Sequence, residues 1–270
     1  MTFILLFLLG VVAAVFGSLI GLGGGVIIVP GLLMLSPYLM DQPLNTAEAV
    51  GTSLMVLIFT GLASTFTGYR QKRIDFRSGW LFFITSGPGS MLGAVVTGRM
   101  NSDAFEILFG VFMLLMAVLI GIRKRIRPLR REWKYRRTYT DIEGRTCHYG
   151  YNLSSALVLG FFVGFVSGLF GIGGGSLFVP VMILLFQFPP HVATATSMFI
   201  ILLSSALGTT TKIYLGEVDF ASAAALAPGA LAGGWFGSWL AGRLKSGVLT
   251  KVLIVSFVIL ALRMIISGIL

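Results

Sequence analysis

A ten-residue glycine-rich block occurs twice in this chain. The first copy reads GLGGGVIIVP at residues 21–30, and the second reads GIGGGSLFVP at residues 171–180. Each copy places four glycines within five positions and a proline five positions after the last of them, inside otherwise apolar sequence. The duplication predicts a fold built from two copies of one structural unit.

Three shorter motifs follow each block in the same order. AVGTSL at 49–54 resembles ATATSM at 193–198, IDF at 74–76 resembles VDF at 218–220, and GRM at 98–100 resembles GRL at 242–244. The connection between the glycine block and the TS pair is six residues shorter in the second copy. These ordered landmarks extend the repeat over most of each half of the chain.

The hydrophobic composition indicates an integral membrane protein. Hydrophobic residues make up 56% of the chain and charged residues 11%, whereas soluble proteins use about 25% charged residues. Most of the apolar segments approach the roughly 20 residues that cross a bilayer, but the two that follow the glycine blocks are shorter. The ten segments are residues 2–20, 26–40, 47–68, 78–98, 104–122, 152–170, 176–188, 192–211, 220–242 and 249–270.

Half of the basic residues lie between the two repeats. Residues 123–145 hold ten of the 20 lysines and arginines, with three acids. Such a segment can bind nucleic acid, but beside membrane spans it is explained by the excess of positive charge in cytoplasmic loops. We therefore expect an N-terminal transmembrane repeat at 1–122, a basic cytoplasmic linker at 123–150 and a C-terminal transmembrane repeat at 151–270, with no nucleic-acid partner.

The charges of equivalent loops are reversed between the repeats. The loop at 69–77 carries four basic residues and one acid, whereas its counterpart holds Lys212 against Glu217 and Asp219. Equivalent loops of opposite bias belong on opposite sides of a membrane. We predict an all-α integral membrane protein with two inverted-topology repeats, each of about five hydrophobic segments with a glycine-rich helix break.

Inverted repeats require an odd number of crossings in each half. Five plus five spans satisfy this condition, and so do three plus three spans with a re-entrant hairpin at each glycine block. Both arrangements place the two termini outside the cell and the linker in the cytoplasm.

The glycine blocks predict breaks between helical segments. Glycine in a helix interior costs about 1 kcal/mol relative to alanine, so four within five positions disfavour a continuous helix. The helix after each break would direct its first N–H groups and the positive end of its dipole toward the glycines, where a small anion fits. Close helix packing is the alternative explanation. The candidate substrate-binding glycines are Gly21, Gly23, Gly24, Gly25, Gly171, Gly173, Gly174 and Gly175.

Two TS pairs are further candidates for substrate binding. Thr52 with Ser53, and Thr196 with Ser197, lie near the starts of the third segment of each half. Their hydroxyls can complete the shell of an anion. Serine and threonine hydroxyls also bond helix carbonyls or join neighbouring helices, and this alternative stays open.

Other polar and special residues have expected roles. Asp75 and Asp219 occupy equivalent DF positions and are expected to cap the following helices. Pro30 and Pro180 follow the glycine blocks and are expected to be structural. No catalytic residue is expected, because nucleophile motifs such as GxSG are missing. No metal site and no cofactor are expected either.

Glu48 and His191 lie near segment ends and are candidate carriers of a coupling proton. Ionisable groups within a membrane are expensive and usually functional, although exposure at the membrane interface is an equally good explanation. Apart from Arg263 near the end of the final segment and Lys251 at its start, the apolar segments contain no lysine or arginine. The charge of an anion would then be balanced by helix N-termini, together with a coupling ion.

The paired blocks resemble a known family. GLGGGVIIVP with AVGTSL, and GIGGGSLFVP with FPPHVATATSM, are similar to the two signature blocks of the sulfite exporter TauE/SafE family, also called 4-toluene sulfonate uptake permeases. The resemblance implies a transporter that moves sulfite, a sulfonate or a related organosulfur anion across the bacterial cytoplasmic membrane. An anion channel, a transporter of a different small anion, an intramembrane hydrolase and a scaffold are the alternatives. The first half departs from the pattern with DQPLNTAEAV at 41–50, where the second has FPPHVA.

Overall fold

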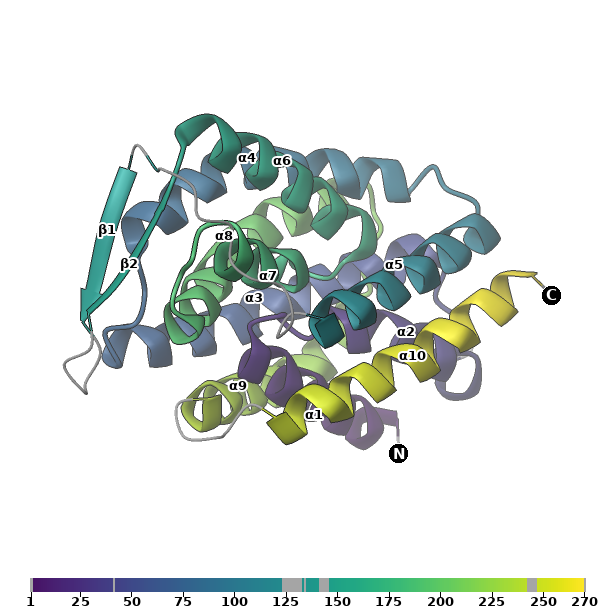
Figure 1. Cartoon of the computed structure of the whole chain (residues 1–270). Helices are drawn as coiled ribbons and strands as arrows, with labels where there is room; N and C mark the ends of the chain where they lie inside the picture. The colour runs from purple at the N-terminus through teal and green to yellow at the C-terminus, as the bar shows by residue number, and fades with distance from the viewer. Residues whose placement is uncertain are drawn as a thin grey trace.

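The computed structural model describes residues 2–40, 42–122, 133, 135–140, 146–241 and 247–269. Each half contributes five helices in the same order (Figure 1). The first half contains α1 (Thr2–Ile20), α2 (Gly25–Leu39), α3 (Thr46–Arg70), α4 (Phe76–Thr97) and α5 (Ser102–Ile122). The second half contains α6 (Leu153–Phe170), α7 (Gly175–Leu184), α8 (Pro190–Tyr214), α9 (Phe220–Ala241) and α10 (Gly247–Ile269).

The long helices are suited to a membrane. Within the described residues, six helices are long and apolar enough to cross a bilayer, namely α1, α3, α4, α5, α6 and α8. Large apolar side chains such as Phe3, Leu8 and Phe162 are exposed on their outer faces. Exposed apolar surface of this extent is expected for lipid contact and unusual for a soluble monomer. The fold is that of a multi-pass membrane protein.

The linker between the halves contains a β-hairpin that the all-α prediction did not include. Strands β1 (Tyr135–Thr140) and β2 (Thr146–Tyr151) pair antiparallel. Tyr149 and Tyr151 are buried by packing against Phe186 and Phe188, which follow α7. Alternating aromatic residues give the hairpin one apolar face, and this face attaches it to the second half.

The helices α3 and α8 form the centre of the molecule and run antiparallel. A Cβ atom added to Gly61 of α3 would lie 3.0 Å from Leu202, and one added to Gly68 would lie 3.2 Å from Ala195. Later residues of α3 therefore contact earlier residues of α8, so the two helices are antiparallel. More of α3 and α8 is buried than of any other candidate span among the described residues. These two equivalent helices of the repeat thus lie side by side in opposite directions.

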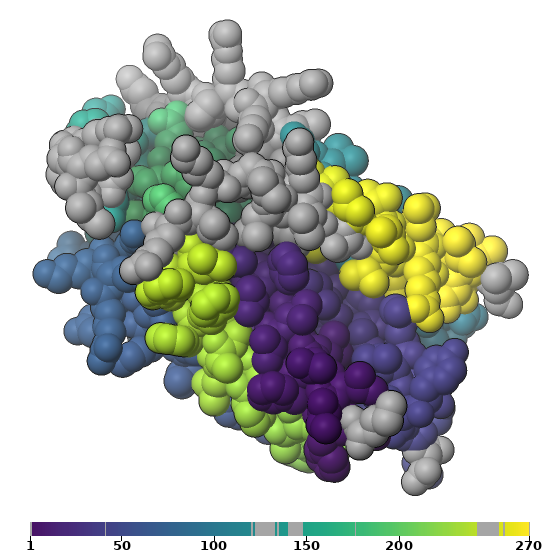
Figure 2. Space-filling model, turned by 90° about the horizontal axis from the view of Figure 1, so that it is seen from below, coloured from purple at the N-terminus to yellow at the C-terminus, as the bar shows by residue number. Residues whose placement is uncertain are grey.

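The outer helices also pack in pairs that join the two halves. Helix α9 packs beside α1, as the yellow-green and purple surfaces in Figure 2 show, and α6 packs beside α4. The glycine contacts show that the helices of each pair are parallel. Helices α5 and α10 are antiparallel, with Gly110 beside Ile265 and Gly268 beside Asp103. Each main helix–helix contact between the halves therefore has a counterpart made by the equivalent helices of the other half. The α1–α9 and α4–α6 contacts are one such pair.

Glycines spaced four residues apart allow the close packing of these outer pairs. Gly229, Gly233 and Gly237 of α9 lie against carbonyl oxygens of α1, and Gly160, Gly164 and Gly168 of α6 face α4. Small residues at this spacing let transmembrane helices approach until their backbones touch. Glycines outside the two glycine blocks thus also carry close helix packing, the alternative role that the sequence left open for the blocks.

We expect a methyl group at Gly233 to destabilise the protein. A Cβ there would lie 2.5 Å from the Val11 carbonyl oxygen and 3.0 Å from Ala14, and overpacking of this kind costs about 1–3 kcal/mol. Gly121 is the matched control, because a Cβ at this helical glycine would come no closer than 3.7 Å to Ile254. Thermal unfolding in detergent should show a lower Tm for Gly233→Ala and an unchanged or higher Tm for Gly121→Ala. Equal Tm values would contradict the packing argument.

Candidate functional site

The two glycine blocks break the chain between helices, as the sequence predicts. Helix α1 ends at Ile20 and α2 begins at Gly25, while α6 ends at Phe170 and α7 begins at Gly175. In each break three glycines have φ between +66° and +97°. Side chains rarely adopt this left-handed conformation, which costs a non-glycine residue about 1–2 kcal/mol. The glycines at these positions therefore permit the turn from one helix to the next.

The two breaks lie directly against each other. A Cβ atom on Gly25 would collide with the carbonyl oxygen of Gly171, and one on Gly175 would collide with the carbonyl oxygen of Gly21. All of these glycines are buried. The structure thus brings together the glycines that the sequence singled out, although the two blocks are separated by well over a hundred residues.

Two equivalent apolar side chains lie beside both breaks. A Cβ on Gly23 would lie 3.1 Å from Leu57 and 3.3 Å from Ile201, and a Cβ on Gly173 would lie 2.9 Å and 2.8 Å from the same side chains. Leu57 belongs to α3 and Ile201 to α8, and both are buried. One side chain from each half therefore lies beside both breaks and contributes apolar groups to their surroundings.

The serines of the TS pairs bond the break of the opposite half. Ser53 Oγ donates a hydrogen bond to the carbonyl oxygen of Gly171 over 2.7 Å, and Ser197 Oγ donates to the carbonyl oxygen of Gly21 over 3.0 Å. Ser197 also contacts the carbonyl oxygen of Thr194 at 2.8 Å. Both serines are buried. In this conformation their hydroxyl protons satisfy backbone carbonyls.

The threonines of the TS pairs hold the loops after α3 and α8. Thr196 Oγ1 accepts a hydrogen bond from the Asp75 amide over 3.0 Å, and Thr52 Oγ1 accepts one from the Asp219 amide over 3.0 Å. The part of the chain that is described offers no hydrogen-bond acceptor to the O–H groups of Thr52 and Thr196. Each threonine therefore keeps a donor.

The carboxylates of the two DF motifs cap helices. The Asp75 side chain accepts from the Ser78 amide at the start of α4, and the Asp219 side chain accepts from the Ala221 and Ser222 amides at the start of α9. Pro30 and Pro180 lie inside α2 and α7, five residues after the first residue of each helix.

The first amides of α2 and α7 supply donors at the breaks. Gly24 and Gly174, the N-cap residues, have no side chain that could accept these hydrogen bonds. The N–H groups of Gly25, Val26 and Gly175 have no protein acceptor among the described residues, and all three residues are buried. Buried amides usually find a partner. The two helix N-termini thus present unused donors and partial positive charge in apolar surroundings.

The candidate proton carriers lie in the first turns of α3 and α8, and Val50, two residues after Glu48, already lies against Gly171. Glu48 forms a capping box with Asn45 in the first turn of α3 and is half-buried. It precedes Ser53 by five residues, which is about 7.5 Å along a helix. His191 lies exposed in the first turn of α8. Because α3 and α8 are antiparallel, the two residues lie at opposite ends of this pair.

Sequence reasoning missed a buried cation. Lys212 had been assigned to a loop, but α8 continues to Tyr214, and the lysine side chain is fully buried with its Nζ atom 2.5 Å from Glu217 Oε2. The expectation that only the final segment places basic residues within a helical span is therefore wrong. Lys212 follows Ser197 by 15 residues, about 22 Å along the helix. Its charge is paired with Glu217 and does not balance an anion at the breaks.

Comparisons with known proteins agree with this architecture. The model of the family "Sulfite exporter TauE/SafE" matches residues 6–264. "Probable membrane transporter protein YunE" of Bacillus subtilis is 44% identical over 271 residues, covering 100% of this chain and 99% of that protein. A "Probable membrane transporter protein" of Methanocaldococcus jannaschii is 30% identical over 229 residues, covering 81% of this chain and 77% of its own length. No solved structure matches the chain.

We expect loss of either cross-half serine bond to destabilise the protein. In Ser53→Ala or Ser197→Ala, the carbonyl of Gly171 or Gly21 loses its buried donor, at a cost of about 1–3 kcal/mol. Ser205→Ala is the matched control, because this buried serine of α8 bonds only carbonyls of its own helix. Thermal unfolding should show a clearly larger loss of stability for the first two variants. Three equal Tm values would mean that the cross-half bonds add no stability.

Proposed function

Because the chain belongs to the sulfite exporter TauE/SafE family, we propose that this membrane transporter moves a small sulfur-containing oxyanion, either sulfite or an organosulfonate. The family assigns transport, and the arrangement of the two glycine breaks supports an anion as the substrate. The bacterial cytoplasmic membrane is the expected location. No cofactor is required for such transport.

The observation that carries the proposal is the meeting of two helix N-termini with unused amide donors. The positive ends of the α2 and α7 dipoles adjoin at the breaks, in apolar surroundings where they act more strongly than in water. Among the described residues, the buried cation Lys212 is far from this point and already paired. Backbone amides that bind an oxyanion without an arginine would favour weakly hydrated anions over cations.

The candidate substrate ligands are the glycines of both breaks and the hydroxyls of the TS pairs. The O–H groups of Thr52 and Thr196 have no acceptor among the described residues and can still donate, whereas Ser53 and Ser197 already donate to carbonyls. Rotation of either serine hydroxyl toward a bound anion would free the carbonyl that it now bonds. Substrate binding would thereby alter the contact between the two halves.

Inverted topology and alternating access complete the proposal. The antiparallel directions of α3 and α8, and of α5 and α10, support two repeats of opposite orientation. Repeats of this kind place a substrate site near the membrane midplane and alternate by motion of one part against another. The excess of basic residues supports a cytoplasmic linker and external termini. The proposal further includes coupling of anion transport to a second ion. This ion is either a proton, carried by Glu48 or His191, or sodium.

Labelling of single cysteines tests the topology. Tyr69 and Tyr214 are exposed and lie in the last turns of α3 and α8. In a background with Cys147→Ser, a membrane-impermeant maleimide should label Tyr214→Cys in intact cells and Tyr69→Cys only after permeabilisation. Labelling of both from the same side would exclude inverted repeats.

Substitution at one break tests the site. Gly174 and Gly216 have nearly the same positive φ, +71° and +72°, so alanine strains both backbones alike. A Cβ on Gly174 would press on Ser167 at 3.3 Å, whereas a Cβ on Gly216 meets nothing within 4 Å. In proteoliposomes containing equal amounts of protein, we expect sulfite uptake to fall at least tenfold for Gly174→Ala and less than twofold for Gly216→Ala.

Equal uptake by both variants would reduce the break to a packing element.

The wild-type protein provides the test of the substrate class. Flux of a metal cation or a neutral solute, without sulfite or sulfonate flux under a pH or a sodium gradient, would contradict the proposed function.

A further inference from the structure

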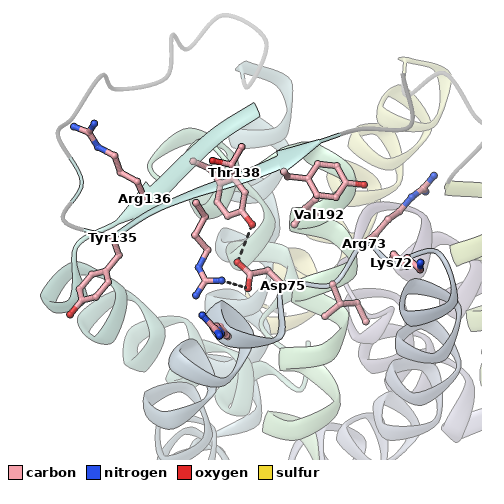
Figure 3. Close-up of a pocket in the computed structure, with 12 residues that line it drawn as sticks. Lys72, Arg73, Asp75, Tyr135, Arg136, Thr138 and Val192 are labelled. Atoms are coloured by element: carbon pink, nitrogen blue, oxygen red, sulfur yellow. Dashed lines mark hydrogen bonds and ion pairs between the residues drawn. The ribbon is translucent and has the colours of Figure 1, made fainter. Parts of the chain in front are cut away.

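A basic pocket lies between the linker hairpin and the turn that joins α3 to α4 (Figure 3). Its volume is about 460 Å³. The turn contributes Lys72, Arg73 and Asp75, and the first turn of α4 contributes Arg77. The hairpin contributes Arg137, with tyrosines from both strands. Charged groups from two distant parts of the sequence therefore line one open pocket at the protein surface.

The hairpin is attached to this turn by Asp75. Its carboxylate accepts a hydrogen bond from the Tyr149 hydroxyl over 3.0 Å and from Ser78 Oγ over 2.6 Å, and it pairs with Arg137 at 3.4 Å. Burial, and then the adjacent Asp75 charge, raise the pKa of the Tyr149 phenol far above its usual value, so the phenol remains a donor. Among the described residues that line the pocket, Asp75 is the one carboxylate, and it is already bonded from several directions.

The cations of the pocket are not balanced in this way. Lys72, Arg73 and Arg77 are exposed or half-buried, and none of them pairs with a carboxylate among the described residues. Arg136 also borders the pocket, but strand alternation directs its side chain away from Asp75, as Figure 3 shows. Within the described part of the chain, Lys72, Arg73, Arg77 and Arg137 against Asp75 give the inner surface a net charge of about +3, with Arg136 at its edge.

The described residues of the second repeat do not reproduce the charges of this pocket. The turn after α8 carries Gly216, Glu217 and Asp219 where the turn after α3 carries Lys72, Arg73 and Asp75. Asp219 caps α9 with backbone contacts, and no described strand lies over it. The positive charges of the turn after α3 are therefore not part of the arrangement that the two halves share at the glycine breaks. They require a separate explanation.

We propose that this pocket binds a small anion carrying a phosphate group, at a site distinct from the transported substrate. Arginine guanidinium groups hold phosphate oxygens in pairs, and lysine adds a point charge. A phosphate with two negative charges matches the uncompensated charge better than a monovalent sulfonate does. The phosphate belongs either to a soluble compound or to a lipid headgroup on the linker side of the membrane.

Thermal unfolding of the purified full-length protein tests the site, because a ligand of the native state raises its Tm. The soluble probes are inorganic phosphate and pyrophosphate, with sulfite for comparison, and the lipid probe is phosphatidylglycerol in nanodiscs of phosphatidylcholine. The test variant is Arg73→Gln/Arg77→Gln, which leaves the Asp75 contacts intact. The control is Arg70→Gln, whose guanidinium lies 4.6 Å from the Phe66 ring and outside the pocket. The Tm of each variant without any probe confirms that it is folded.

We expect pyrophosphate or phosphatidylglycerol to raise the Tm of the wild-type and control proteins. The concentration required should increase at least tenfold in the double variant. A response to pyrophosphate in pure phosphatidylcholine identifies a soluble ligand, and a response to phosphatidylglycerol alone identifies a headgroup. No response to any phosphate probe, the same response in the double variant, or a response to sulfite alone would overturn the proposal.

Discussion

Backbone groups at a broken helix need hydrogen-bond partners that a lipid bilayer does not provide, and each unsatisfied group costs several kcal/mol. The breaks in this chain meet part of that requirement across the interface between the halves. Ser53 of the first half bonds the carbonyl of Gly171, and Ser197 of the second bonds the carbonyl of Gly21. Neither break is complete without the other half, so the two repeats depend on each other. The amides that remain unused are the basis of the proposed anion site.

Local features of the site could be predicted from the sequence, but its cross-half contacts could not. The left-handed turns require glycine, so the GxGGG blocks located both breaks almost to the residue. The bond from Ser53 to Gly171 joins residues 118 positions apart. It depends on how α3 packs against the second half, which no local pattern specifies. For this reason the TS pairs were identified as candidates while their present partners were not.

The missed elements have specific physical causes. The strands of the hairpin are short, and the many charges of the linker obscured the alternating tyrosines that attach it to Phe186 and Phe188. Lys212 was assigned to a loop because a charged residue normally ends an apolar segment. The helix continues past it because Glu217, five residues later, folds back and neutralises the buried ammonium group. Removing either partner of such a pair leaves an unpaired buried charge, which is strongly destabilising.

The two ends of the α3–α8 pair are closed by different interactions. At one end, Asp75 holds the hairpin through Arg137 and Tyr149. At the other, Lys212 pairs with Glu217 inside the helix bundle. Under the proposed alternating access, each end must open in turn while the breaks keep their backbone partners. A symmetric core would give the two open states similar free energies, so these unlike contacts would make the free energies of the two states differ. A phosphate held beside Asp75 would change that preference without contacting the transported anion, because it would compete with Asp75 for Arg137.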